Sequence, residues 1–230
     1  MTRKTAARRR AGLALALLGL ALAGCAGLVL EPSEQAPTRE LTADALASTV
    51  WTTRSEPRYL RQTALFEAGR RKVAADGLLK LDPAGKTARL VAVNEVGVKL
   101  FDLTVTPGAV IENFLLPELA GAKGFSAAVA TCLRAVFLAY EPRGDDRLDR
   151  TAERYELSRR DAGGRLRCVF GGRETLLFKE FEGGDQSWTV RFFDYQPHGS
   201  LWLPERTVFT DRRAGYRVSL WLREVRDAHE

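Results

Sequence analysis

Hydrophobic and polar residues alternate along most of the chain from Tyr59 onward, and turn residues interrupt the alternation at short intervals. For example, Phe101, Leu103 and Val105 are each separated from the next by a polar residue. Successive side chains of a strand point to opposite faces, so this pattern predicts strands with one buried face. We expect strands at residues 59–68, 72–81, 87–94, 98–106, 109–115, 154–160, 165–170, 174–182, 187–195, 201–210 and 215–225.

Glycine-rich and proline-rich turns separate these segments, as at Gly171-Gly172 and Gly183-Gly184. Short strands with such turns indicate antiparallel hairpins. A meander of about ten or eleven strands curls, because strands twist relative to their neighbours. The sequence therefore predicts a mainly β (α+β) fold whose concave face is apolar.

One segment in the middle of the chain has helical spacing. Within residues 125–140, Val129, Val136 and Phe137 recur on one face, and Ser126 lies near the start. This predicts one amphipathic helix that packs its apolar face against the sheet. The next segment, residues 143–154, is rich in Arg and Asp and is expected to be a solvated loop.

Near the amino terminus, a basic run at residues 3–10 precedes an uncharged apolar run at residues 11–30. A positive segment, a short apolar segment and small residues at a cleavage point indicate a secretory signal peptide. The tetrapeptide that ends at Cys25, Leu-Ala-Gly-Cys, resembles the lipobox of bacterial lipoproteins. The resemblance implies cleavage before Cys25 and acyl chains, such as palmitate, on that cysteine. Two or more acyl chains anchor a protein stably, so we expect a membrane-tethered protein outside the cytoplasm.

Two alternatives remain for this segment. Residues 11–30 are just long enough to cross a bilayer uncut, and they are also compatible with the signal of a soluble exported protein. By the sorting rule of the lipoprotein family, Ala26 in place of Asp implies the periplasmic face of the outer membrane. The expected organisation is a signal peptide at 1–24, a lipidated cysteine and tether with room for a short helix at 25–52, and a folded domain at 53–230.

The charge of the chain changes when the signal peptide is set aside. Removing the five basic residues of 1–24 from the 35 Lys and Arg leaves 30, against 29 Asp and Glu, a net charge of +1. A nucleic-acid-binding domain usually keeps a basic excess. Nucleic acid is therefore not an expected partner.

Cys132 and Cys168 are the two cysteines of the expected domain. Disulfides persist outside the cytoplasm, so the two residues could be bridged. The alternative is a pair of buried thiols that act as small apolar side chains.

Catalytic motifs are scarce. The chain has two histidines, His198 and His229. His198 precedes Ser200 in a turn, without the Gly-x-Ser-x-Gly elbow of a serine hydrolase. Zinc-ligand spacing and phosphate-binding glycine loops are absent from the sequence. We predict that the protein is not an enzyme and has no catalytic residues, metal or cofactor.

Two stretches resemble LolB, the family of outer-membrane lipoproteins that receive other lipoproteins from the periplasmic carrier LolA. Residues 89–103, Arg-Leu-Val-Ala-Val-Asn-Glu-Val-Gly-Val-Lys-Leu-Phe-Asp-Leu, correspond to a strand, a protruding turn and a returning strand. Residues 203–211 and 216–222 are similar to the closing hairpin of the family. The likeness spans roughly residues 55–225. The same fold group includes uncharacterised lipoproteins that accompany aryl-polyene and related lipid biosynthesis.

The resemblance implies a curled antiparallel half-barrel with a helical lid over an apolar cavity. The helix at 125–140 would be the lid, with Val129, Val136 and Phe137 on its inner face. Val96 matches the apolar residue that the family's turn presents to the membrane, although Val replaces Leu here. The expected cavity wall consists of Phe66, Leu90, Phe101, Leu103, Val218, Leu220 and Leu222. Ordinary core packing is the alternative for each wall residue, and an ordinary hairpin tip is the alternative for Val96.

The expected function is therefore that of an outer-membrane lipoprotein that binds acyl chains and takes part in lipoprotein or lipid transfer. Its cargo would be acyl chains or lipoproteins, and a LolA-like periplasmic protein would be the donor. We expect the protein to be a monomer. The alternative is a scaffold lipoprotein of an envelope complex whose concave face is filled by its own side chains. Whether the interior is open distinguishes the two functions.

Overall fold

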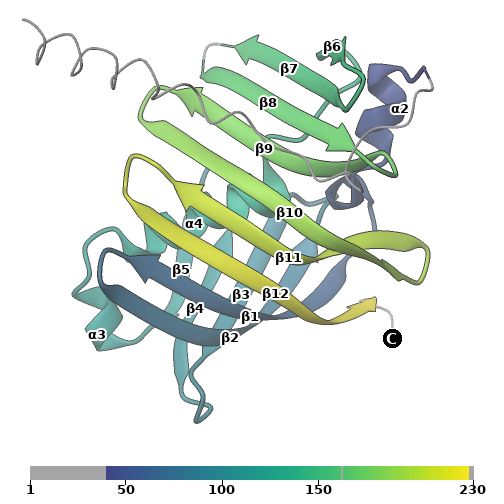
Figure 1. The fold of residues 1–230 in the computed structure, drawn as a ribbon. Coiled ribbons are helices and arrows are strands. Elements are labelled where there is room, and N and C mark those ends of the chain that lie inside the picture. Colours follow the sequence, from purple (N-terminus) through teal and green to yellow (C-terminus); the bar gives the residue numbers. More distant parts are fainter. Residues whose placement is uncertain (1–39, 162, 228–230) are drawn as a thin grey trace, which may run out of the picture. The chain divides into compact units, whose positions relative to one another are not determined.

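A computed structural model describes residues 40–161 and 163–227 of the chain (Figure 1). These residues belong to one compact unit, Glu34–Glu230, and form one twelve-stranded antiparallel sheet. The strands are β1 (Arg58–Ala68), β2 (Arg71–Asp82), β3 (Thr87–Val93), β4 (Lys99–Val105), β5 (Val110–Leu115), β6 (Arg147–Arg150), β7 (Tyr155–Asp161), β8 (Gly164–Gly171), β9 (Thr175–Gly183), β10 (Gln186–His198), β11 (Leu201–Asp211) and β12 (Tyr216–Asp227). The predicted signal peptide and Cys25 lie outside the described residues.

The order of the strands determines where the helices lie. The sheet runs β5-β4-β3-β2-β1-β12-β11-β10-β9-β8-β7-β6, so β1 and β12 pair in its middle and β5 and β6 are its edges. The connection from β5 to β6 joins these opposite edges. It contains α3 (Pro117–Ala120), α4 (Phe125–Leu133) and one π-helical turn, η3 (Arg134–Leu138). α4 packs on β4 and β5, and η3 packs on β3.

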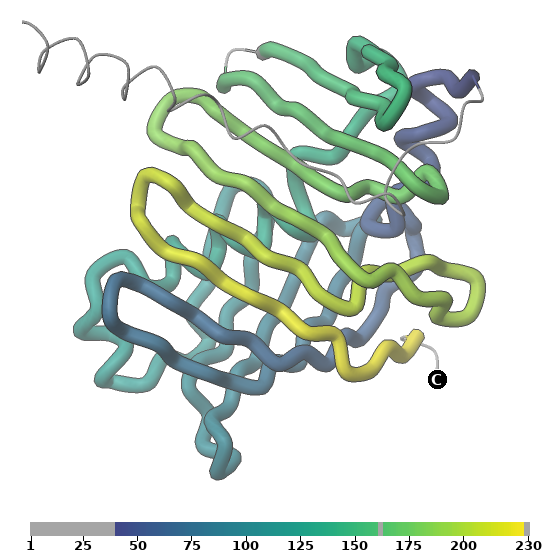
Figure 2. The backbone as a smooth tube through the Cα atoms, viewed as in Figure 1, coloured from purple at the N-terminus to yellow at the C-terminus, as the bar shows by residue number. Residues whose placement is uncertain are grey.

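The sheet curls over this connection. Figure 2 shows the strands of the carboxyl-terminal half, drawn in green to yellow, passing in front of the teal strands β3–β5. We call the covered side of the sheet its inner face and the opposite side its outer face. The predicted mainly β fold, with a curled and unclosed antiparallel sheet, is confirmed.

The described sheet has twelve strands where the sequence predicted ten or eleven, and the additional strand is β6. It lies within residues 143–154, which the sequence predicted as a loop. β6 is an edge strand in which Leu148 is half-buried and the other three residues are exposed. Charged residues on an edge strand oppose unwanted pairing, and they also hide the alternating pattern that identifies a strand.

The helix predicted at 125–140 is interrupted. α4 ends at Leu133, and the chain continues as the π-helical turn η3, in which the Ala139 amide donates to the Arg134 carbonyl oxygen at 2.8 Å. A π-helical turn contains more residues than an α-helical turn, so the side chains that follow rotate to a different face. The apolar spacing therefore predicted the correct segment but the wrong geometry at its end.

The segment before β1 packs on the core. It contains α2 (Ala43–Ser48), inside the range expected for a short helix, and the 3-10 helix η2 (Trp51–Thr53). Leu46 is fully buried, and the Trp51 ring meets the Phe137 ring edge-on with a centroid distance of 5.8 Å. Among residues 40–161 and 163–227, no helix is long and apolar enough to span a membrane.

Large side chains fill the inner face of β8–β10. Phe181 on β9 pairs with Leu166 on β8 and with Trp188 on β10. The Tyr140 ring, which follows η3, lies 4.7 Å from the Phe181 ring and 4.9 Å from the Trp188 ring, measured between centroids. This half of the sheet is therefore closely packed against the connection that crosses it.

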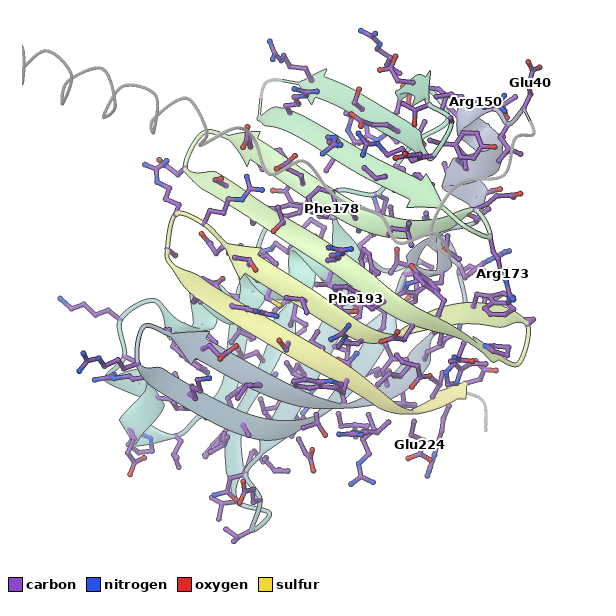
Figure 3. All side chains as sticks on the ribbon, in the orientation of Figure 1. Glu40, Arg150, Arg173, Phe178, Phe193 and Glu224 are labelled. Carbon is purple, nitrogen blue, oxygen red and sulfur yellow. The ribbon has the colours of Figure 1, made fainter. Side chains whose placement is uncertain are left out.

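The outer face carries arginine side chains over aromatic rings. Figure 3 labels Phe178 on β9 and Phe193 on β10. The Arg167 guanidinium lies 5.8 Å from the centroid of the Phe178 ring, and the Arg206 guanidinium lies 4.2 Å from that of Phe193. The outer face thus covers its aromatic rings with charged side chains instead of a second layer of structure.

Lys179 on β9 is fully buried and fastens η3 to the sheet. Its ammonium group donates to the Ala135 carbonyl oxygen at 3.2 Å and to Glu141 Oε1 at 3.3 Å. Arg159 donates in turn to the Glu141 carbonyl oxygen at 2.8 Å and to the Asp146 carboxylate at 3.1 Å. A charged network therefore runs from the end of the helical segment to the edge of the sheet.

We expect Lys179→Met to lower the free energy of unfolding by about 3 kcal/mol, because the Glu141 carboxylate loses the cation that balances it. Urea unfolding followed by tryptophan fluorescence measures the change. Lys123→Met, at an exposed lysine, is the control and should change stability by less than about 0.5 kcal/mol. A Lys179→Met protein as stable as the control would show that the buried ammonium does not hold η3 in place.

Candidate ligand-binding cavity

A cavity of about 300 Å³ lies between the inner face of the sheet and the helical connection. Its sheet side is formed by the amino-terminal strands β1–β4 together with β12. This volume is at the lower end of the range for small-molecule sites, roughly 300–1,000 Å³. The lining residues on the sheet are Gln62, Ala64, Phe66, Arg71, Val73, Ala75, Gly77, Leu90, Ala92, Leu100, Phe101, Val218 and Leu220.

Small side chains leave the space open. Ala64 on β1 lies opposite Ala75 on β2, and Gly77 on β2 lies opposite Ala92 on β3. A Cβ atom on Gly77 would approach Leu90 Cδ1 to 3.0 Å, so glycine permits this close approach. In β8–β10, the paired residues on the inner face are Leu, Phe and Trp, and their large side chains fill the space. Side-chain size, on strands of the same kind, determines which half of the inner face is hollow.

The opposite side of the cavity comes from the connection. α3 and its flanks contribute some of the lining residues, and α4 contributes one side of its helix. The lining residues here are Leu116, Glu118, Leu119, Ala122, Phe125, Val129, Cys132 and Leu133.

Hydrogen bonds hold α4 in place over the sheet. The Tyr216 hydroxyl on β12 donates to the Ala128 carbonyl oxygen at 2.9 Å. Burial raises the pKa of this hydroxyl well above its usual range, so it remains a donor even where an exposed tyrosine would lose its proton. Arg134 donates to the carbonyl oxygens of Thr106 and Ala109 at 2.7 and 2.8 Å, which ties the end of α4 to the β4–β5 turn.

The structure places most of the predicted wall residues on the cavity. Phe66, Leu90, Phe101, Val218 and Leu220 line it.

Two predicted wall residues lie elsewhere. Leu103 and Leu222 are on the inner face but are buried within the core and do not line the cavity. Alternation identifies the face on which a residue lies. It does not identify which part of that face is covered by a helix.

Of the three residues predicted for the inner face of the lid, one lines the cavity and two do not. Val129 on α4 lines the cavity. Val136 and Phe137, in η3, are buried in the core instead of the cavity wall. The π-helical turn separates the two groups, because it changes the face on which the following side chains lie.

The sequence pattern did not predict that α3 and its flanks form part of the cavity wall. This helix has four residues and begins with Pro117 at its first turn, a position that favours proline. Leu116 and Leu119 face the cavity from this segment. The signal was present as Leu116-Pro117, but a helix of one turn has no measurable periodicity.

Val96 is at the tip of the β3–β4 hairpin, with 81% of its surface exposed. The Asn94 side chain shapes this turn, since its Oδ1 accepts from the amides of Val96 and Val98 at 3.1 and 2.9 Å. Gly97 follows with φ of 81°, a conformation that favours glycine. The turn thus presents an apolar side chain to solvent.

Cys132 and Cys168 are free thiols, and both are buried. Cys132 lines the cavity, whereas Cys168 lies on the inner face of β8. Burial raises the pKa of each thiol to about 12. The structure therefore has the unbridged alternative, in which both cysteines act as small apolar side chains.

The surroundings of His198 are those of a residue in a hairpin. His198 Nε2 lies 2.8 Å from Glu205 Oε1 across the β10–β11 hairpin, so its ring is held by a neighbouring carboxylate. Within the described residues, no three His, Cys, Asp or Glu side chains gather closely enough to hold a metal ion.

The architecture is that of the LolA/LolB-like fold group. The crystal structure of a LolA superfamily protein from Nitrosomonas europaea aligns with a TM-score of 0.52 at 11% sequence identity, over 81% of this chain and 94% of that chain. This similarity shows the fold, and it confirms the predicted fold group.

Two further solved structures match less closely. A domain assigned to outer membrane lipoprotein sorting from Vibrio parahaemolyticus has a TM-score of 0.42 and 10% identity, over 76% of this chain and 86% of that chain. A DUF1329 family protein from Desulfovibrio piger has a TM-score of 0.35 and 12% identity, over 77% and 88%. The sequence matches no protein-family model and no curated protein.

The two thiols provide a direct test of the core. In residues 34–230 under native conditions at pH 7, we expect neither Cys132 nor Cys168 to react with Ellman's reagent within minutes, because both side chains are buried and their pKa values near 12 leave far less reactive thiolate than an exposed cysteine has. In denaturant without reductant, both should react. No reactive thiol in denaturant would show that the two residues are bridged.

Proposed function

We propose that the protein binds acyl chains in this cavity and takes part in the transfer or insertion of lipids or lipoproteins at the outer membrane. The observation that carries the proposal is the cavity of about 300 Å³ whose walls are almost entirely apolar. Water gains few hydrogen bonds in such a space, so an apolar ligand is the favoured occupant. The shared fold of a LolA superfamily protein supports the same function.

The gain on burying an acyl chain is large enough for transfer without chemical fuel. Each methylene group moved out of water contributes about 0.8 kcal/mol. A chain that buries about ten methylenes gains roughly 8 kcal/mol, against which the cost of association must be set. The net affinity is then moderate, which suits a protein that has to release its cargo.

The proposed place of action follows from the amino terminus. Acyl chains on Cys25 would anchor the protein to the outer membrane and leave the cavity on the periplasmic side. A LolA-like donor would deliver cargo there, and the protein would act as a monomer without nucleic acid, metal, cofactor or catalytic chemistry. The sequence around Cys25 supports this arrangement.

A scaffold lipoprotein is the second candidate. The observation in its favour is the closely packed inner face of β8–β10, where Trp188 and Phe181 are buried. A protein whose cavity remains closed to ligands would have this function in an envelope complex.

Ala75→Phe separates the two functions. Ala75 lines the cavity, so a phenyl ring there should fill it and weaken binding of a neutral fluorescent probe, N-phenyl-1-naphthylamine, by about tenfold or more. Fluorescence titration of residues 34–230 measures the affinity. Lipid mass spectrometry of the protein purified without detergent identifies any bound acyl chain.

Ala74→Phe is the matched control. Ala74 is the preceding residue on β2 and is exposed on the outer face, so the same ring at this position should leave probe affinity unchanged. If the wild type is folded by circular dichroism and binds neither probe nor lipid, the cavity is closed and the scaffold function is preferred.

The hairpin tip makes a second prediction for the proposed function. Val96→Leu should strengthen binding of residues 34–230 to phospholipid vesicles by a few-fold, since one added methylene contributes about 0.8 kcal/mol. Val96→Asp should weaken it. Ile111→Asp is the control in vesicle sedimentation, because Ile111 is another exposed apolar residue, on β5 opposite Thr104 of β4. Equal binding by all variants would make Val96 an ordinary hairpin tip.

A further inference from the structure

Few polar side chains line the cavity, and they come from three different elements of the structure. Gln62 lies on β1, Arg71 is the first residue of β2, and Glu118 is on α3. Arg71 and Glu118 are exposed to solvent although both line the cavity. A charged group that touches both the solvent and an apolar cavity marks the entrance of that cavity.

Arg71 stands at the end of an apolar row. Residues two apart on a strand share a face, and Arg71, Val73, Ala75 and Gly77 all line the cavity from β2. The row from Arg71 to Gly77 spans about 20 Å at the rise of an extended strand. Arg71 is therefore at one end of a path along which an extended chain can lie.

The neighbouring lysine has a different environment. Lys72 faces the outer side of β2, where its ammonium group pairs with Glu67 Oε1 at 2.8 Å. Within the described residues, Arg71 has no carboxylate within the 4.0 Å of an ion pair, and Glu118 lines the same cavity without closing on it. The guanidinium is thus available to a ligand, while the ammonium beside it is already paired.

We infer that the ligand is an amphiphile with one acyl chain and an anionic group, a carboxylate or a phosphate ester, and that the anionic group binds Arg71. This inference rests on the proposed function and names the class of ligand for the same cavity. Guanidinium presents paired N–H donors that match the two oxygens of either anion. The chain lies along Val73, Ala75 and Gly77, where small side chains leave room for it.

Glu118, which also lines the cavity, opposes Arg71 in the selection of the ligand's charge. Its carboxylate repels an anionic group, so Arg71 has to outweigh it for an anionic amphiphile to be preferred. If Glu118 were the stronger of the two, the cavity would prefer a cationic amphiphile. Tighter binding of dodecyltrimethylammonium than of dodecanoate and dodecanol would therefore contradict the inference.

The test is displacement of N-phenyl-1-naphthylamine from residues 34–230 by these three amphiphiles and by dodecyl phosphate, at pH 8 and low salt. We expect dodecanoate, dodecyl phosphate or both to bind at least about fivefold more tightly than dodecanol, a preference that added salt reduces. The relative affinities of dodecanoate and dodecyl phosphate show which anion the site takes. Arg71→Gln should remove the preference for the anion, and Glu118→Gln should increase it.

Lys72→Gln is the matched control, since it removes one positive charge from the adjacent position on the outer face. It should keep the preference for the anion. If dodecanol binds as well as both anions, or if Arg71→Gln keeps the preference, Arg71 does not select the ligand and the inference is wrong while the proposed function stands. The proposed function itself fails if none of the amphiphiles displaces the probe from a folded protein, because none of them then binds in the cavity.

Discussion

The pairing of β1 with β12 is the constraint on which the rest of the structure depends. The two strands pair from Arg58 opposite Asp227 to Ala68 opposite Tyr216. This pair occupies the middle of the sheet, so the strands from the middle of the chain, β5 and β6, become its edges. The chain between them has to cross the sheet. Crossing on the inner face lets it bury its apolar side chains, whereas the outer face is charged. The helical covering of the sheet is thus a consequence of strand order.

A connection that crosses the sheet does not by itself create a cavity. The two halves of the sheet show that the size of the side chains beneath the connection also matters. Where the connection passes over β8–β10, it meets Phe181 and Trp188, and its own Tyr140 packs against both rings. Where it passes over β1–β3, it meets Ala64, Ala75 and other small residues. Tyr216 and Arg134 hold α4 in position through backbone carbonyl groups, so the helix does not collapse onto the small side chains.

The sequence contained much of this architecture because a strand with one buried face has a regular period. Eleven strands were predicted from alternation, but β6 was not, since an edge strand with a single half-buried residue, Leu148, has no period to detect. The cavity was harder to predict. Leu103 and Phe101 have the same alternation, yet one is covered by the core and the other lines the cavity. The difference depends on the path of the connection, and therefore on long-range packing. Arg71 gave no signal, because a charged residue beside a turn is common.

The size of the cavity limits the cargo, and the contacts around it indicate where more volume can come from. A cargo with several acyl chains needs more than about 300 Å³. α4 is held by Tyr216 and Arg134, and η3 by the buried Lys179, so moving either breaks hydrogen bonds to the sheet. α3 contains no buried residue. Displacing α3 exposes less apolar surface and breaks fewer contacts, so it costs less free energy than displacing α4. Since α3 carries Glu118, its displacement would also move the carboxylate that opposes Arg71 in the proposed selection of an anionic ligand.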